Sequence, residues 1–354
     1  MGLFSFLSNF FGGGETSVKS FDSTKSSKNK PEVVENDEEE EVAEEEIPWW
    51  ENPVQRGESP EFEALTNTVL YDELNRSLQE SRLEIIEIPD NISAILDIIH
   101  RKNFKYDEIT QLIEHSPVLT GDFLSIANSA AFSRGIAIRN LSQALPRLGK
   151  QTIQSILFLN ASKMTVPNSS IFQKTAEEVI MESQAVAKIC RMLGEKLYGD
   201  GNEAFLAGLL HNIGKLGLLK QIANFYEVPE DLDMEYHQSL FSNIFPMFYQ
   251  EAGGIIGKYW KLEEKIVQAI SHHNKLDELI ENKVSGVDLK IAALVNISVY
   301  MAKIIGFGDS TISEPDLFGQ ASAEIVGLKD SPGTRKLLNE IYEAVAEHMP
   351  AAAA

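Results

Sequence analysis

The sequence predicts an all-α protein that carries a disordered acidic tail at its N-terminal end. From Glu61 onward, apolar residues recur every three to five positions over segments of helical length, which is the pattern of amphipathic helices. No segment alternates between apolar and polar residues for long, so solvated β-strands are not expected. No unit of roughly 20–50 residues repeats, which argues against a solenoid.

Residues 1–60 differ in composition from the rest of the chain and are predicted to form a disordered acidic tail. An apolar tip (1–11) precedes a Gly/Ser/Lys stretch and an acidic run over 32–46. Such a segment buries too little apolar area to offset its ordering entropy. Trp49 and Trp50 interrupt it, and a pair of exposed tryptophans is typical of a docking peptide. The alternative is that the whole segment is a solvated linker.

The periodicity predicts a leading helix over 61–84, followed by the helices of the main body. Short helices are expected around 92–99, 109–113, 119–127 and 153–161, and longer ones around 171–197, 203–222, 238–260, 263–273 and 288–305. A last helix near 334–348 lies in a C-terminal helical extension that covers 311–354.

Composition excludes several classes of protein. A formal net charge of −22 argues against nucleic-acid binding, which requires a basic surface. The single cysteine, Cys190, cannot form an internal disulfide, and its apolar neighbours predict a buried thiol in a cytoplasmic protein. No apolar run is long enough to span a bilayer. The apolar tip lacks Lys and Arg, so peripheral contact of residues 1–11 with a membrane is less favoured than contact with a protein.

The most informative motif runs from Ala204 to Lys215, where an apolar segment ends in His211 and Asn212. On one continuous helix, His211 and Lys215 would be four residues apart and share a face. Three further features follow along the chain. They are a glycine pair that should allow close helix packing (Gly253-Gly254), a tryptophan (Trp260) and a histidine pair (His272-His273).

Upstream, Pro117 to Thr120 leads to Ala127-Asn128-Ser129-Ala130 and then to a segment that ends at Gly149. Together, these three blocks resemble the HDOD domain family, the catalytically degenerate relatives of the HD metal-phosphohydrolases. The resemblance places an HDOD domain over 85–310. Ser116 stands where the family has an Asp, and Pro146 is an unusual residue that should weaken or shorten its helix unless it lies in the first turn.

The resemblance also defines where metal ligands would lie, and this chain departs from the pattern there. Asn212 replaces the Asp after which the HD superfamily is named, and Glu182 and Tyr249 occupy two places where relatives have a histidine. Asparagine lacks the negative charge that a hard divalent cation prefers. We therefore expect no bound metal, no other cofactor and no catalytic residue. A degenerate pocket should contain His211, Asn212 and Lys215, and the His272–His273 pair supplies at most one residue to it.

Structural roles are expected for most of the polar and glycine residues in these motifs. His211 should be a hydrogen-bonded core histidine, and Lys215 should pair with a carboxylate. Asn128 and Ser129 should cap or bridge helices. Family signature positions with a structural role are Asn128, Ser129, Gly149, Gly208, Gly253 and Trp260.

The function that the resemblance implies is non-enzymatic. Family members act near two-component systems, cyclic-dinucleotide signalling, motility and stress control, so a bacterial regulatory scaffold or sensor with a protein partner is expected. The alternative is a residual metal-dependent phosphohydrolase, perhaps acting on a cyclic nucleotide, and the ligand count disfavours it.

Overall fold

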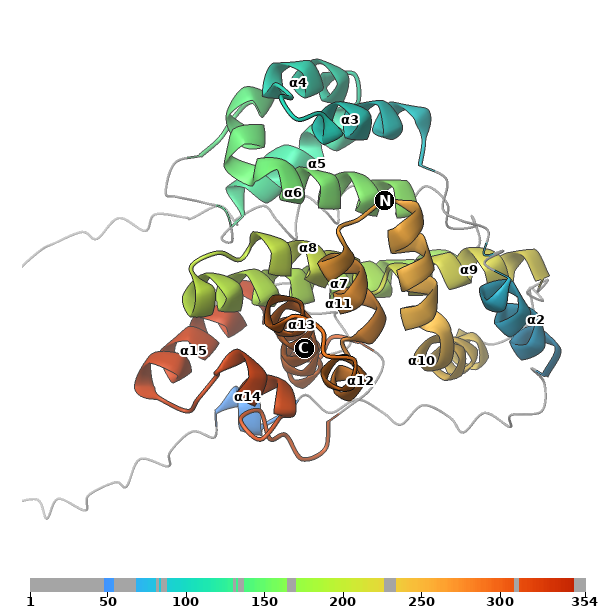
Figure 1. The fold of residues 1–354 in the computed structure, drawn as a ribbon, viewed down its shortest axis with the longest axis vertical. Coiled ribbons are helices and arrows are strands. Elements are labelled where there is room, and N and C mark those ends of the chain that lie inside the picture. The colour runs from blue at the N-terminus through green and yellow to red at the C-terminus, as the bar shows by residue number, and fades with distance from the viewer. Residues whose placement is uncertain are drawn as a thin grey trace, which may run out of the picture.

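The computed structural model describes residues 48–53, 68–80, 83, 88–129, 132, 137–163, 170–225, 234–308 and 312–346. All regular elements in these ranges are helices, which confirms the all-α prediction (Figure 1). Their bounds are η1 Trp49–Glu51, α2 Thr68–Gln79, α3 Asp90–His100, α4 Tyr106–Glu114, α5 Pro117–Asn128, α6 Leu141–Lys163, α7 Ser170–Tyr198, α8 Asn202–Leu210, α9 Ile213–Phe225, α10 Met234–Tyr259, α11 Glu264–His272, α12 Leu276–Glu281, α13 Gly286–Ile305, α14 Ala321–Val326 and α15 Pro332–Ala346.

Helices α3 to α5 form an upper layer that rests on α6 (Figure 1). Each buries one apolar stripe, as α3 does with Ile92, Ile95 and Ile99. The start of α5 is fixed locally, because the Ser116 hydroxyl accepts a hydrogen bond from Leu119 N (3.3 Å). Ser116 is therefore an N-cap, a role for which serine and aspartate are both favoured.

Helix α6 bends at Gly149, which lies outside the helical region with φ +77° and ψ 165°. The chain continues helically through Pro146, so the proline does not end the helix by itself; the interruption follows at the glycine. Glycine adopts positive φ without steric cost, whereas another residue would be strained here. The bend divides α6 into two segments, and the whole helix contacts α3, α4 and α5 on one side and α8 and α9 on the other.

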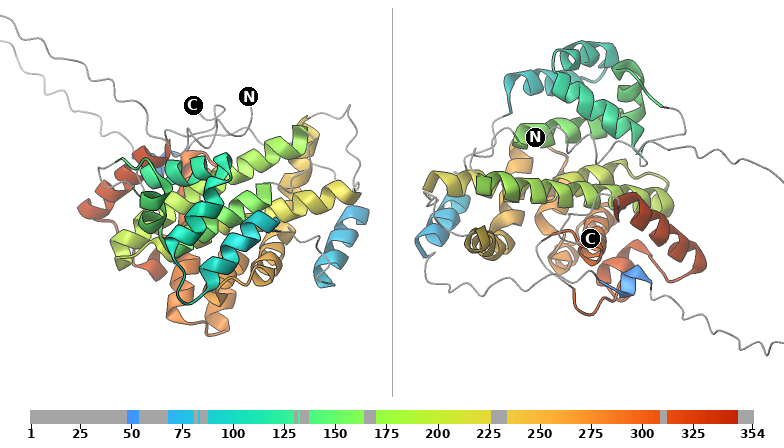
Figure 2. Two further views of the ribbon diagram at one scale, coloured as in Figure 1. Left: turned by 90° about the horizontal axis from the view of Figure 1, so that it is seen from above. Right: turned by 180° about the vertical axis from the view of Figure 1, so that it is seen from behind.

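The lower layers are built around the long helix α7, which packs against α8, α13 and α15. Helix α10 packs against both α9 and α11, and α11 also packs on α13. The views from above and behind show the upper layer stacked across this body (Figure 2). The helices that position the cavity described below are therefore α7, α9, α10 and α13, joined by one continuous apolar core.

The predicted helix over 203–222 is wrong in one respect, because it is interrupted by a turn at His211 and Asn212. The turn directs α9 along α10, where Gly214 lies against the backbone of Tyr249 and Gly253. A Cβ at Gly214 would clash with the Tyr249 carbonyl oxygen, so only glycine allows this approach. His211 and Lys215 consequently belong to a turn and to the helix that follows it, not to one continuous helix.

The predicted disordered tail must be corrected at residues 48–53. Trp49–Glu51 form a short 3-10 helix that packs on α13, with Trp50 only 5% exposed. The Trp49 ring stacks on Tyr342 of α15, with centroids 5.5 Å apart. The tryptophans are therefore docked on the chain's own body, because burying two large rings removes much apolar surface from water. The apolar tip and the acidic run lie outside the described residues.

Helices α14 and α15 pack on α13 and α7, so they add to the main body. The described part of the predicted leading helix is α2, which packs on α9 and α10. Among the described helices, none combines the length and the apolar character that a membrane crossing requires.

Candidate functional site

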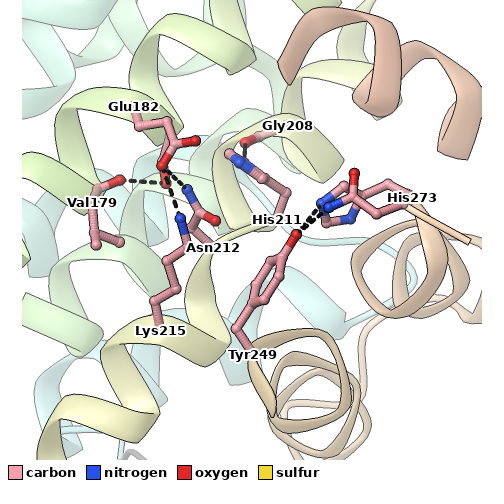
Figure 3. Close-up of polar contacts among 10 residues, drawn as sticks. Val179, Glu182, Gly208, His211, Asn212, Lys215, Tyr249 and His273 are labelled. Carbon is pink, nitrogen blue, oxygen red and sulfur yellow. Dashed lines mark hydrogen bonds and ion pairs between the residues drawn. The ribbon is translucent and has the colours of Figure 1, made fainter. Parts of the chain in front are cut away.

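A cavity of about 90 Å³ lies where α7, α9, α10 and α13 meet. Buried polar side chains form part of its lining, and several of them are drawn in Figure 3. Other lining residues are exposed to solvent. The lining residues are Glu182, His211, Asn212, Lys215, Pro246, Tyr249, Asn274, Val299 and Lys303.

Glu182 of α7 is the central charged group of this cavity. Its Oε2 accepts hydrogen bonds from Asn212 Nδ2 (2.8 Å) and from Lys215 Nζ (3.1 Å), and the latter contact is also an ion pair (Figure 3). Burial alone would raise the pKa of Glu182, but the positive charges of Lys215 and Lys303 and the two hydrogen bonds outweigh it and lower that pKa. Glu182 is therefore an ionised carboxylate that is already engaged by protein donors.

His211 is buried, and only one of its ring nitrogens has a partner. Nδ1 lies 2.7 Å from the carbonyl oxygen of Gly208, which can only accept, so Nδ1 carries the proton. Nε2, on the opposite edge of the ring, is buried and has no hydrogen-bond partner among the described residues. Burial, and the nearby positive charges of Lys215 and Lys303, lower the pKa of His211 to about 3. The imidazole is thus neutral, and its Nε2 lone pair is an unused acceptor.

His273 lies behind Tyr249, and its ring meets that of His211 edge to face at 5.4 Å. Its Nδ1 lies near the carbonyl oxygens of Ala269 and Ile270, so Tyr249 Oη donates to its Nε2 (2.9 Å) (Figure 3). Burial is the main cause that lowers the pKa of His273 to about 3. This second histidine is neutral as well, and both of its nitrogens are in use.

Glycines allow the helices around the cavity to approach one another. A Cβ at Gly208 would lie 2.9 Å from the sulfur of Cys190, and one at Gly253 would lie 2.7 Å from Ile270. Gly308, with φ +86°, lies against the Glu182 carboxylate, which a Cβ would approach to 3.1 Å. Close packing was expected at Gly253 and Gly254, and a Cβ at Gly254 would likewise lie against Ser271.

The structure brings together most of the residues predicted for the degenerate pocket. His211, Asn212 and Lys215 line the cavity, and His273 supports it through Tyr249. His272 is half-buried, with Nδ1 near the Gln268 carbonyl oxygen (3.4 Å), and it does not line the cavity. Glu182 and Tyr249 also line the cavity.

Lys303 and Asn274 were missed by the sequence reasoning. Lys303 is a half-buried residue of α13, far along the chain from the His-Asn motif, and no local pattern marks it. Asn274 donates to Tyr249 Oη (2.6 Å) and is the residue directly after the histidine pair. Its position directly after the histidine pair is the sequence feature that could have identified Asn274.

The remaining signature residues have structural roles away from the cavity. The Asn128 side chain donates to the Ile138 carbonyl oxygen (2.8 Å) and accepts from Ile138 N (2.7 Å), so it bridges the end of α5 to the segment before α6. Ser129 Oγ donates to the Ile126 carbonyl oxygen at the same helix end. Trp260 stacks on Phe158 with centroids 4.6 Å apart.

The donor set of this cavity does not fit a divalent metal ion. Within the part of the chain that the structure describes, no three His, Cys, Asp or Glu side chains are grouped so that they could share one. The one carboxylate that lines the cavity is paired with Lys215, and Lys303 adds a second positive charge nearby. A hard cation needs several oxygen or imidazole ligands free to face it.

Comparisons with known proteins agree with this architecture. The family model of the HDOD domain matches residues 85–276. Among curated proteins, an uncharacterized protein of Treponema pallidum is 24% identical over an alignment of 204 residues that covers 54% of this chain and 38% of that protein. The chain thus spans well under half the length of this relative.

Solved structures with the same fold cover most of the chain at low sequence identity. One is an HDOD domain protein of unknown function from Geobacter sulfurreducens, with a TM-score of 0.53, 20% identity, and coverage of 79% of this chain and 99% of that one. Another is a provisionally assigned metal-dependent phosphohydrolase from Shewanella amazonensis, with a TM-score of 0.54, 19% identity, and coverage of 77% and 98%. A third is a provisionally assigned signal transduction protein from Marinobacter aquaeolei, with a TM-score of 0.51, 17% identity, and coverage of 82% and 66%.

Proposed function

The chain belongs to the HDOD domain family, and on this premise we propose that it is a non-enzymatic regulatory protein of a bacterial signalling pathway. It would act by binding, as a scaffold or sensor, with a protein partner in the cytoplasm. Two of its relatives in fold carry provisional assignments as a phosphohydrolase and as a signal transduction protein. The residues of the cavity favour the second kind of role.

The observation that carries this proposal is the state of Glu182. In an HD-type phosphohydrolase, carboxylate and imidazole ligands hold a metal that generates the attacking hydroxide. Here the carboxylate is bound by Lys215 and Asn212, and the Asn212 amide donates where a ligand would have to accept. The ammonium group of Lys215 thus neutralises the carboxylate that would otherwise be available to a metal ion.

Catalysis without a metal would need a general base and an activated water, and the cavity does not offer this pair. His211 is neutral and has a free acceptor, but its pKa of about 3 makes it a very weak base. The Tyr249 hydroxyl donates a hydrogen bond to His273 and accepts one from Asn274, so it already has protein partners. These groups are suited to ligand recognition more than to proton transfer.

A hydrolysis assay tests the non-enzymatic role directly. The full chain is incubated with cyclic dinucleotides and a chromogenic phosphodiester in the presence of Mn²⁺ or Mg²⁺, and we expect no turnover above the buffer rate. The control is His211→Ala, which removes the candidate group while leaving contaminants unchanged. A rate that scales with protein concentration and is lost in His211→Ala would refute the proposal and support a phosphohydrolase.

The partner is tested by affinity capture with two forms of the chain. The shortened form lacks residues 2–47 but keeps Trp49 and Trp50, so the docked segment still covers α13 and α15. Partner capture by both forms would assign binding to the helical body, and capture by the full chain alone would assign it to residues 2–47. Failure of both forms to retain any partner would argue against the scaffold role.

A further inference from the structure

The cavity carries one net positive charge. Its charged lining residues are Glu182, Lys215 and Lys303, and the first two neutralise each other in an ion pair. Lys303 makes no hydrogen bond or ion pair to another side chain in the part of the chain that the structure describes, and it interacts with Glu182 only through the longer-range field. Lys303 is half-buried, and its positive charge is therefore available to bind an anion from solution.

The second unused group is His211 Nε2. Its residue is 1% exposed, the atom has no partner among the described residues, and Nδ1 already carries the ring proton. A buried acceptor without a hydrogen bond costs free energy, so a ligand that donates to it would recover that cost. The ligand must hence bring an O–H or N–H group as well as a negative charge.

The size and opening of the cavity limit the ligand further. A volume of about 90 Å³ is several times the roughly 10–15 Å³ that a cavity needs in order to hold one water molecule, so a small ion can enter it. Pro246 and Asn274 at its edge are exposed, so the buried floor can be reached from solvent. A tetrahedral oxyanion matches this scale, whereas a whole nucleotide could place only a terminal group inside.

We propose that this cavity is a metal-free binding site for a small protonated oxyanion, of which inorganic phosphate is the simplest example. One oxygen would accept from Lys303, and one O–H would donate to His211 Nε2. The inference deepens the proposed sensor role and rests on it, because it gives the sensor a ligand class. The proposed anion site lies where the metal centre of an HD-type enzyme would lie, but its net positive charge favours an anion in place of a cation.

The comparison of phosphate with sulfate tests the donor requirement. The two ions have the same shape, but at neutral pH phosphate keeps at least one proton and sulfate keeps none. Titration calorimetry on the full chain at matched ionic strength should give phosphate binding at least about tenfold tighter than sulfate binding, because only phosphate satisfies the buried acceptor. His211→Phe should erase this preference.

Lys303→Gln tests the charge and avoids the fully buried floor. It should weaken phosphate binding by about tenfold or more, since a charge-assisted hydrogen bond is lost. Lys290→Gln is the matched control, because it removes one positive charge from an exposed position of the same helix. Circular dichroism of each variant establishes that the helices remain.

The outcomes separate this inference from the proposed function. No phosphate binding at millimolar concentration, equal affinity for both ions, or an unchanged affinity in Lys303→Gln would each overturn the phosphate site and leave the non-enzymatic role standing. Release of phosphate from a monoester added in the same experiment would overturn the proposed function and this inference with it.

Discussion

The two buried histidines make a quantitative prediction about acid stability. His211 and His273 both have a pKa of about 3 in the folded chain, against an ordinary value of 6.5. Well above pH 6.5 both rings are neutral in the folded and unfolded states, so they do not affect the pH dependence there. As the pH falls from 6.5 toward 3, the unfolded chain binds protons that the folded chain excludes, and the free energy of unfolding decreases.

The size of this decrease follows from the linkage relation. At pH 5 each histidine lowers the free energy of unfolding by about 2 kcal/mol relative to pH 7.5, and the pair by about 4 kcal/mol. Such a loss is a large part of the stability of an ordinary domain. His211→Gln keeps a donor for the Gly208 carbonyl and should remove about half of the loss between pH 7.5 and pH 5.

Urea unfolding, followed by circular dichroism at a series of pH values, measures this effect for each variant. His272→Gln is the matched control, because that side chain is half-buried and lies outside the cavity, and it should retain the full pH dependence. The reasoning fails if the parent chain has the same free energy of unfolding at pH 7.5 and pH 5. It also fails if His211→Gln shows the parent's undiminished acid loss.

Three other substitutions test separate parts of the structure. Glu182→Gln should lower the free energy of unfolding by about 3–5 kcal/mol, because Lys215 stays buried without its carboxylate. Adding Lys215→Met should recover most of this stability in the same urea titrations. If Glu182→Gln leaves the free energy of unfolding unchanged within error, the pair is not buried. Trp50→Ala should cost about 3–5 kcal/mol by removing a buried indole from the core, and unchanged stability would separate this segment from the folded body. Asn212→Asp alone should not retain Mn²⁺ after dialysis, because Lys215 and Lys303 still repel it; one equivalent by elemental analysis would contradict this.

The long helices could be predicted from the sequence because their apolar positions keep a regular period. Helices α7, α10 and α13 each extend over many turns, so a few exceptions do not hide the pattern. Helices α12 and α14 have six residues each, which is too short for periodicity to stand out. The bend at His211 was hidden for another reason: Ala204 to Leu210 are buried on every side, so no single face marks the axis of α8.

The candidate site was predictable where its residues belong to one local motif. His211, Asn212 and Lys215 lie within five residues of one another, and Glu182 and Tyr249 were found by aligning neighbouring motifs. Lys303 comes from a helix whose own sequence carries no such pattern, so its contribution depends on how α13 packs on α7. The docking of Trp49 on Tyr342 joins the two ends of the described chain, and composition alone cannot reveal such a distant contact.

The only sulfhydryl of the chain has a practical consequence for measuring these effects. Cys190 is fully buried between α8 and α13, where its sulfur lies 3.7 Å from the Leu294 carbonyl oxygen, and burial raises its pKa to about 12. A maleimide or an aromatic disulfide reagent reacts with the thiolate, so the folded protein should resist labelling. The rate at which Cys190 is modified then measures how often this helix junction opens. A cysteine introduced on the surface can carry a single fluorophore without removal of Cys190.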